Sequence, residues 1–266
     1  MRAANARLLT WAERQVRACR PIALKYFRSA SLRVERKADR SPVTQADRAI
    51  EERLRKALAR DFPGESILGE EFGRSGACAD SFWSIDPIDG TRAFSRGLPS
   101  WGIMLGRVER GRAVLGVVDY PAIGTTIAVG PGVRAYERTG SRRIAFPKPR
   151  PVRSLNDAVI FHGGLRWWNQ PRYIRAFEKV IQASYLERAY GDCFGYLYVL
   201  RGQADAMLDY GVKPWDLIPF AALAASTGHL LCDFRARPSF TGPETIMAHL
   251  SLAKLLAKTL NSSVAK

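Results

Sequence analysis

Apolar positions along the chain follow two patterns. Spacing of three to four residues predicts helices, and short apolar runs predict strands. A helical period runs over residues 6–28 and again over residues 45–60. Pro21 should interrupt the first of these helices, and Thr44 should cap the second. Short apolar runs instead predict strands, which lie at residues 33–37, 66–69, 82–85, 101–108, 113–120 and 125–129.

The second half of the chain alternates between the two patterns. Strands are predicted near 158–162, 186–190, 204–209 and 229–233, and helices near 171–184, 194–201, 216–228 and 244–259. Residues 137–153 carry three prolines and many arginines, which predicts an exposed loop or edge segment. Hairpins in the first half and helix–strand alternation in the second favour a layered α/β architecture with mixed sheets. We expect one domain over residues 1–266, with an N-terminal part over about 1–150 and a C-terminal part over about 151–266.

Composition excludes several classes of protein. At 266 residues, with 47% hydrophobic and 25% charged residues, the chain has the make-up of a globular protein with a full core. The four cysteines are scattered and the three histidines share no ligand spacing, which argues against a disulfide framework or a zinc cage. We therefore expect a reducing cytoplasm and, for any metal, oxygen ligands. The amphipathic start does not resemble a signal peptide, and no apolar run is long enough to span a membrane.

The net charge of +16 is unevenly distributed. The basic excess lies in residues 1–60 and 134–153, whereas the remaining residues are balanced. A nucleic-acid surface is one interpretation, an arginine-rich solvated surface is another, and steering of anionic substrates is a third. We favour the solvated surface and do not expect nucleic acid as a partner.

The segment from Asp86 to Thr91 carries the most chemical information. It reads Asp-Pro-Ile-Asp-Gly-Thr and follows the apolar run Phe82–Ile85. A strand here delivers two carboxylates, and Gly90 and Thr91 then open a predicted helix. Carboxylates hold hard cations, and free N–H groups at a helix start hold anions. The segment therefore favours a metal site beside a phosphate site.

Acidic side chains occur at three more boundaries between a strand or loop and a helix. These are Asp47, the pair Glu70 and Glu71, and Asp216. Each has a simpler interpretation when taken alone. Asp47 completes a capping box with Thr44, Asp216 fits an N-cap, and the glutamates fit solvated surface. The Asp86 segment alone also fits a turn.

Together these segments resemble the inositol monophosphatase-like family of metal-dependent phosphomonoesterases, over roughly residues 10–250. The matching motifs are Lys37-x-Asp39-x-Ser41-Pro42-Val43-Thr44-x-x-Asp47, Leu68-Gly69-Glu70-Glu71, Asp86-Pro87-Ile88-Asp89-Gly90-Thr91 and Trp215-Asp216. The resemblance implies a layered αβαβα sandwich with mixed sheets, two or three Mg²⁺ ions and a homodimer. It also implies that a metal-activated water attacks the phosphorus of a small phosphorylated substrate directly.

The resemblance also implies roles for individual residues. The metal ligands would be Glu70, Asp86, the carbonyl of Ile88, Asp89 and Asp216. Glu70, Thr91 and Asp47 would be catalytic, with Thr91 and Asp47 polarising the water. The substrate would be bound by Gly90, Thr91, Arg92 and Asp192.

Within the family, the chain is most similar to the bacterial histidinol-phosphatase branch. The similarity lies in residues 86–94 and 97–102, and in Tyr190-Gly191-Asp192. Asp192 could pair with a substrate ammonium group, or it could cap the helix ahead of Phe194. One departure is the segment from Gly132 to Pro151, where arginines and prolines replace the family's hairpin.

We therefore expect hydrolysis of histidinol phosphate to histidinol, a step of histidine biosynthesis. The alternatives are an inositol-1-monophosphatase, a broad-range sugar or nucleotide phosphatase, and, from another class, a non-catalytic protein that binds polyanions or nucleic acid.

Overall fold

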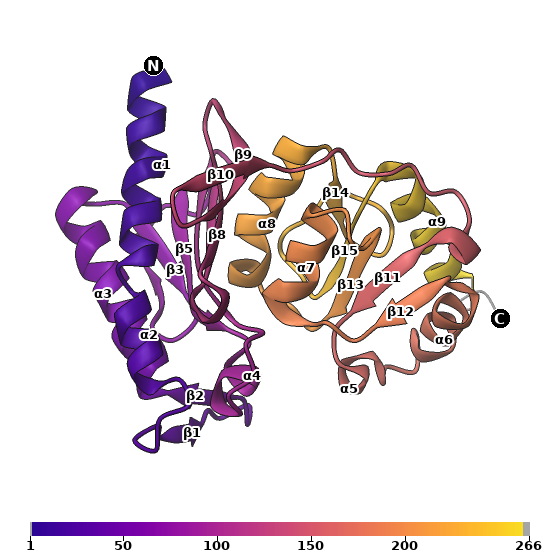
Figure 1. Ribbon diagram of the computed structural model, residues 1–266, viewed down its shortest axis with the longest axis horizontal. Helices are drawn as coiled ribbons and strands as arrows, with labels where there is room; N and C mark the ends of the chain where they lie inside the picture. The colour runs from indigo at the N-terminus through magenta and orange to yellow at the C-terminus, as the bar shows by residue number, and fades with distance from the viewer. Residues whose placement is uncertain (1, 263–266) are drawn as a thin grey trace. The chain divides into compact units, whose positions relative to one another are not determined.

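The computed structural model describes residues 2–262, and side chains from residue 6 onward. Contacts between Cα atoms divide the chain into two compact units, one up to Ala145 and one from Phe146 onward (Figure 1). Each unit has a hydrophobic core of its own. Over residues 2–262, no helix is both long and apolar enough to cross a bilayer.

The first unit is built on an eight-stranded sheet. Its strand order is β10-β9-β8-β7-β6-β5-β3-β4, and every neighbouring pair is antiparallel except β3 and β5. The strands are β3 (Ser66–Gly69), β4 (Gly73–Ser75), β5 (Phe82–Asp89), β6 (Gly102–Glu109), β7 (Arg112–Tyr120), β8 (Thr125–Gly130), β9 (Val133–Thr139) and β10 (Arg142–Ala145). A separate two-stranded sheet joins β1 (Val34–Arg36) to β2 (Pro42–Thr44).

Helices cover one face of the large sheet (Figure 1). They are α1 (Arg2–Arg17), α2 (Arg20–Tyr26) and α3 (Gln45–Asp61), and a single-turn helix α4 (Thr91–Ser95) follows β5. The break that Pro21 predicts is confirmed, because α1 ends at Arg17 and Pro21 lies in the first turn of α2. Buried Ile50 and Leu54 of α3 join Trp83 of β5 in one core. The apolar stripe of α3 thus places this helix beside the strand that carries Asp86.

The second unit is built on a five-stranded mixed sheet of order β12-β11-β13-β15-β14. Its strands are β11 (Val159–His162), β12 (Leu186–Arg188), β13 (Ala206–Tyr210), β14 (Leu230–Cys232) and β15 (Glu244–Ala248). Its helices are α5 (Leu165–Trp168), α6 (Ile174–Ala183), α7 (Asp192–Leu200), α8 (Pro214–Thr227) and α9 (Leu250–Asn261). Figure 1 shows α7 and α8 on one face of this sheet and α6 and α9 on the other.

The predicted α/β fold with mixed sheets is confirmed, but some predicted elements are wrong. Residues 244–248 form strand β15 rather than the start of a helix, and α9 begins only at Leu250. β15 lies between β13 and β14, and its residues Ile246 to Ala248 are fully buried. A strand buried on both faces is a continuous apolar run, which periodicity cannot distinguish from a buried helix.

The arginine-rich segment is also more ordered than a loop. Residues 133–145 form the β9–β10 hairpin, and β10 is the edge strand of the eight-stranded sheet. The edge position predicted for this segment is correct, but the loop begins only after Ala145. Every residue of β10 is exposed, and its arginines are typical of an edge strand that is protected from pairing with another chain.

Candidate active site

Strand β5 carries Asp86 and Asp89 at its carboxyl end. The strand continues through both residues, so it is longer than the run over 82–85 predicts. Residues three apart in a regular strand point to opposite faces, but the pairing with β6 shifts by one residue between Asp86 and Asp89. This bulge brings one carboxylate oxygen of each aspartate within 4.8 Å of the other. Asp86 is buried, and Asp89 is half-buried.

The turn after β5 depends on Gly90. Its φ of 85° is left-handed, and a Cβ atom there would lie 2.6 Å from the carbonyl oxygen of Ser100. The five residues of α4 sum few peptide dipoles, so a phosphate would depend on the Gly90 and Thr91 N–H groups themselves rather than on a macrodipole. Arg92 is exposed on this helix.

Thr91 links the β5 turn to α3. Its hydroxyl lies 3.0 Å from the carbonyl oxygen of Ile88 and 3.3 Å from Oδ1 of Asp47, and it can donate to either. Oδ2 of Asp47 accepts from the N–H and the hydroxyl of Thr44, so the predicted capping box is present. The capping interpretation and the catalytic one are therefore compatible, since each uses a different oxygen of Asp47.

Asp47 is fully buried, and its carboxyl group titrates unusually high. Burial raises the pKa to about 6, against the opposing effect of the hydrogen bonds from Thr44. The negative charge of Glu70 contributes to this rise in the pKa of Asp47. This repulsion shows that Asp47 and Glu70 lie in the same acidic environment.

Glu70 and Glu71 form the turn between β3 and β4. The N–H of Glu70 donates to the carbonyl oxygen of Ile85, which places Glu70 beside the residue that precedes Asp86. Nζ of Lys37 donates to Oε1 of Glu70 at 2.8 Å and to Oε1 of Glu71 at 2.7 Å. Burial disfavours the charge of Lys37, but these two carboxylates outweigh it and raise the pKa of its ammonium group.

Glu71 responds to the same environment. Burial raises the pKa of Glu71 to about 7, and the neighbouring charge of Glu70 adds to the effect, although Lys37 opposes it. Four carboxyl groups, those of Asp47, Glu70, Asp86 and Asp89, thus lie around the β3–β4 turn and the end of β5 in the first unit. An all-oxygen, like-charged set fits a hard divalent cation such as Mg²⁺, because the cation would relieve the repulsion.

Asp216 and Asp192 belong to the second unit. Asp216 is the third residue of α8 rather than its N-cap, which is Lys213. Oδ2 of Asp216 accepts from the N–H of Lys213 at 2.7 Å, as in a capping box. Asp192 is the exposed first residue of α7, and Gly191 is the N-cap. Asp192 has a φ of 55°, a left-handed conformation that aspartate tolerates better than most residues.

Asp209 is an acidic residue that the sequence reasoning missed. It lies near the end of β13, and its pKa is raised well above the usual range, first by burial and then by the charge of Asp192, with a smaller effect from Asp216. Its Oδ1 accepts from the N–H of Tyr210. A Cβ atom at Gly163 would lie 2.1 Å from this oxygen, so the carboxylate fills the space beside that glycine. The sequence feature that could have identified Asp209 is its place directly after the apolar run Ala206–Leu208.

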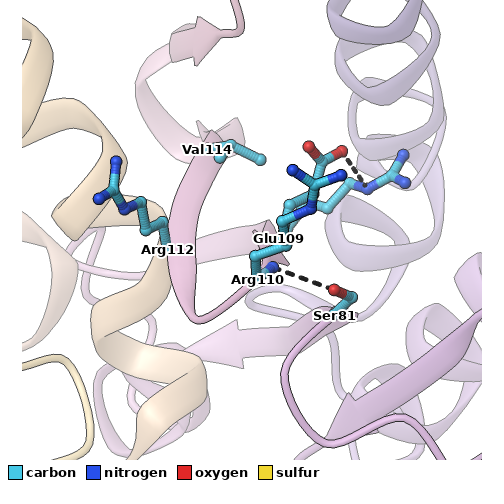
Figure 2. A pocket seen from close by; sticks show the side chains of 6 residues that line it. Ser81, Glu109, Arg110, Arg112 and Val114 are labelled. Carbon is cyan, nitrogen blue, oxygen red and sulfur yellow. Dashed lines mark hydrogen bonds and ion pairs between the residues drawn. The ribbon is translucent and has the colours of Figure 1, made fainter.

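A groove at the other end of β5 is lined mainly by arginines (Figure 2). It has a volume of about 800 Å³ and is lined by Ser81, Arg107, Glu109, Arg110, Arg112 and Val114. Arg107 pairs with Glu65 and Glu109, and the N–H of Arg110 donates to the hydroxyl of Ser81. Ser81 precedes the first residue of β5, whereas Asp86 and Asp89 lie at its carboxyl end, so the groove is separate from the acidic set.

Comparisons with known proteins agree with the resemblance read from the sequence. The model of the inositol monophosphatase family matches residues 4–265. A histidinol-phosphatase of Mycobacterium tuberculosis is 34% identical over 202 residues, covering 76% of this chain and 78% of the relative. A Nus factor SuhB of Pseudomonas aeruginosa is 32% identical over 251 residues, covering 88% of this chain and 89% of the relative.

Solved structures give the same result. An IMPase of Thermotoga maritima superposes with a TM-score of 0.81 at 25% identity, covering 96% of this chain and 97% of the other. An inositol monophosphatase of Zymomonas mobilis superposes with a TM-score of 0.79 at 27% identity, covering 94% and 97%. From the family match over nearly the whole chain and from these relatives, we conclude that the chain belongs to the inositol monophosphatase family and is a phosphoric monoester hydrolase.

Proposed function

We propose that this phosphatase hydrolyses histidinol phosphate to histidinol in a Mg²⁺-dependent reaction. The observation that supports the chemistry best is the carboxylate set of the first unit, in which Asp86 and Asp89 offer oxygens within 4.8 Å of each other. The histidinol-phosphatases among the relatives, at 34% and 31% identity, support the substrate. An IMPase/NADP phosphatase of the same fold is described in complex with Mg²⁺ and phosphate, which agrees with the choice of metal.

In this proposal Mg²⁺ supplies positive charge for the phosphoryl oxygens and makes a bound water more acidic. Two or three Mg²⁺ ions would be held by Glu70, Asp86, Asp89 and the carbonyl oxygen of Ile88. Asp216 remains a predicted further ligand.

The remaining roles concern the phosphate and a proton. The N–H groups of Gly90 and Thr91 orient the phosphate, and Arg92 contributes charge from the exposed face of α4. Oδ1 of Asp47 accepts the Thr91 hydroxyl hydrogen, so Thr91 can in turn accept a proton from the attacking water.

The acids of the second unit support a cationic substrate. Asp192 and Asp209 lie close enough for the charge of Asp192 to raise the pKa of Asp209. Histidinol carries an ammonium group, which would relieve this repulsion, whereas inositol carries only hydroxyl groups. We propose that Asp192 binds the ammonium group. By the same resemblance, the protein acts as a homodimer in histidine biosynthesis, and its scattered cysteines suit a reducing cytoplasm.

A panel of substrates tests the proposal. Phosphate release is measured from histidinol phosphate, inositol monophosphate and an adenosine bisphosphate, each with Mg²⁺ and with EDTA. We expect the highest kcat/KM with histidinol phosphate and turnover only with Mg²⁺. A higher kcat/KM with inositol monophosphate would favour the inositol-phosphatase alternative. Similar kcat/KM values for all three substrates would favour the broad-range phosphatase.

The Asp89→Asn variant tests the metal site in the same assay. It keeps the size of the side chain and removes its charge, so it should lose Mg²⁺-dependent turnover. Full activity in this variant, or turnover of the wild-type protein in EDTA, would contradict the proposed chemistry.

A further inference from the structure

Glu51 is a buried carboxylate to which the proposed function gives no role. It lies one turn after Asp47 on α3 and is fully buried. Its Oε2 accepts from the N–H of Glu71 at 2.7 Å, and its Oε1 accepts from the N–H of Phe72 at 3.2 Å. A buried carboxylate is costly unless it is hydrogen-bonded. Two backbone donors and a cationic partner meet this requirement for Glu51, so its position in the fold is specified by its hydrogen bonds.

The cationic partner is Arg55, one turn further along α3. Its Nε donates to Oε1 of Glu51 at 2.8 Å. The same guanidinium group donates to the carbonyl oxygen of Gly73 and, at 3.1 Å, to the hydroxyl of Ser75. Glu51 and Arg55, here called the α3 clamp, therefore bind four of the five residues that follow Glu70, namely residues 71, 72, 73 and 75.

Gly69 gives independent evidence that the fit is close. A Cβ atom at this position would lie 2.0 Å from Oε1 of Glu51 and 2.8 Å from the Arg55 guanidinium group. Gly69 is not among the residues with positive φ, so space rather than backbone conformation requires the glycine. The missing side chain of Gly69, directly before Glu70, thus leaves the space that the carboxylate of Glu51 occupies.

The α3 clamp fixes the backbone around Glu70. The N–H of Glu70 is bound to Ile85 of β5, and the next N–H along the chain is bound to Glu51. Both peptide units that flank the Glu70 Cα atom are therefore held. Backbone dihedrals restrict the side-chain rotamers, so holding them restricts the direction of the Glu70 carboxylate.

We infer that Glu51 is a positioning residue that aims Glu70 into the metal site. This inference rests on the proposed function, because it requires Glu70 to be a metal ligand. Replacing a group that orients a metal ligand typically lowers the metal affinity by about 10-fold to 100-fold. Glu51 acts through two backbone N–H groups rather than on the ligand side chain, which distinguishes it from the hydrogen bonds that Lys37 makes.

The test compares Glu51→Gln with Glu52→Gln in the otherwise intact protein. Glu52 is the matched control, because it is the next residue of α3, is exposed, and pairs with Lys56 of the same helix. Mg²⁺ binding is measured by isothermal titration calorimetry without substrate, and kcat and KM are measured at rising Mg²⁺. We expect Glu51→Gln to weaken Mg²⁺ binding by about 10-fold or more, with activity partly recovered at high Mg²⁺, and Glu52→Gln to match the wild type.

Two further variants make the result decisive. The double variant Glu51→Gln/Glu70→Gln should bind Mg²⁺ no more weakly than Glu70→Gln alone, because Glu51 acts through Glu70. Arg55→Gln should weaken Mg²⁺ binding in the same direction, and it serves in place of Glu51→Gln if that variant does not fold.

The outcomes separate the two ideas. A lower melting temperature with unchanged Mg²⁺ affinity in Glu51→Gln, or in Arg55→Gln where it takes its place, would overturn the inference and leave the α3 clamp a purely stabilising feature. Additive losses in the double variant would overturn it as well. If Glu70→Gln itself binds Mg²⁺ as the wild type does, the proposed role of Glu70 fails, and the inference fails with it.

Discussion

The hydroxyl of Thr91 lies 3.3 Å from Oδ1 of Asp47, although 43 residues separate the two in the sequence. The contact joins the turn after β5 to the first turn of α3. Both residues are buried, so the hydrogen bond is shielded from water. The oxygen of Asp47 that faces Thr91 is the one that the capping box does not use, which leaves it available for a proton relay.

Replacing Thr91 tests this relay. Thr91→Val keeps the shape of the side chain and removes the hydroxyl, so kcat should fall by about 100-fold or more, the usual contribution of a positioned proton acceptor. Thr91→Ser keeps the hydroxyl and should retain most of the activity. The measurement is kcat and KM at saturating Mg²⁺, and equal kcat in the valine and serine variants would contradict the role.

The acidic motifs could be predicted from sequence because they are local. The capping box of Asp47, the strand before Asp86 and the glycine before Thr91 each depend on neighbours within a few residues. The bulge in β5 could not be predicted, because it is defined by the pairing with β6, and the sequence alone does not give the register.

Residues that act across the fold were missed for the same reason. Glu51 looks like one more charged residue on the helix 45–60, and only the return of the chain at residues 69–75 buries it. Asp209 becomes unusual only because β13 carries it into the interior near Asp192. Burial of a polar residue is a tertiary property that local pattern does not encode.

Gly90→Ala should destabilise the protein and weaken phosphate binding. Alanine at a left-handed φ costs about 1–2 kcal/mol, and at Gly90 the new methyl group would also meet Ser100 at 2.6 Å. Gly111→Ala is the matched control, because Gly111 has a φ of 70° but no atom within 4 Å of the added Cβ. The free energy of unfolding from urea titration should fall more in Gly90→Ala, and inhibition by inorganic phosphate should weaken only there. Equal losses in both variants would show that the Ser100 contact has no effect.

Asp192→Asn should change the substrate preference rather than the chemistry. A charge-assisted hydrogen bond contributes about 1.5–3 kcal/mol, so kcat/KM for histidinol phosphate should fall by about 10-fold to 100-fold. Activity on an uncharged phosphate monoester such as inositol monophosphate should remain at the wild-type level, because Asp192 has no ammonium group to bind there. A parallel loss on both substrates would indicate that Asp192 supports the fold of α7 instead.

His229 should make the protein less stable in acid. Burial, with a smaller contribution from the neighbouring His249, lowers the pKa of its imidazole to about 4. The unfolded chain has a histidine pKa near 6.5, so between about pH 6.5 and pH 4 the unfolded state binds a proton that the folded state does not. The contribution of His229 to stability is therefore fully present above pH 6.5 and is lost as the pH falls toward 4. As the pH falls from 8 to 4, the melting temperature of the wild type should fall more steeply than that of His229→Gln, because glutamine fills similar space and does not titrate. A constant difference between the two curves would show that His229 is not the group responsible.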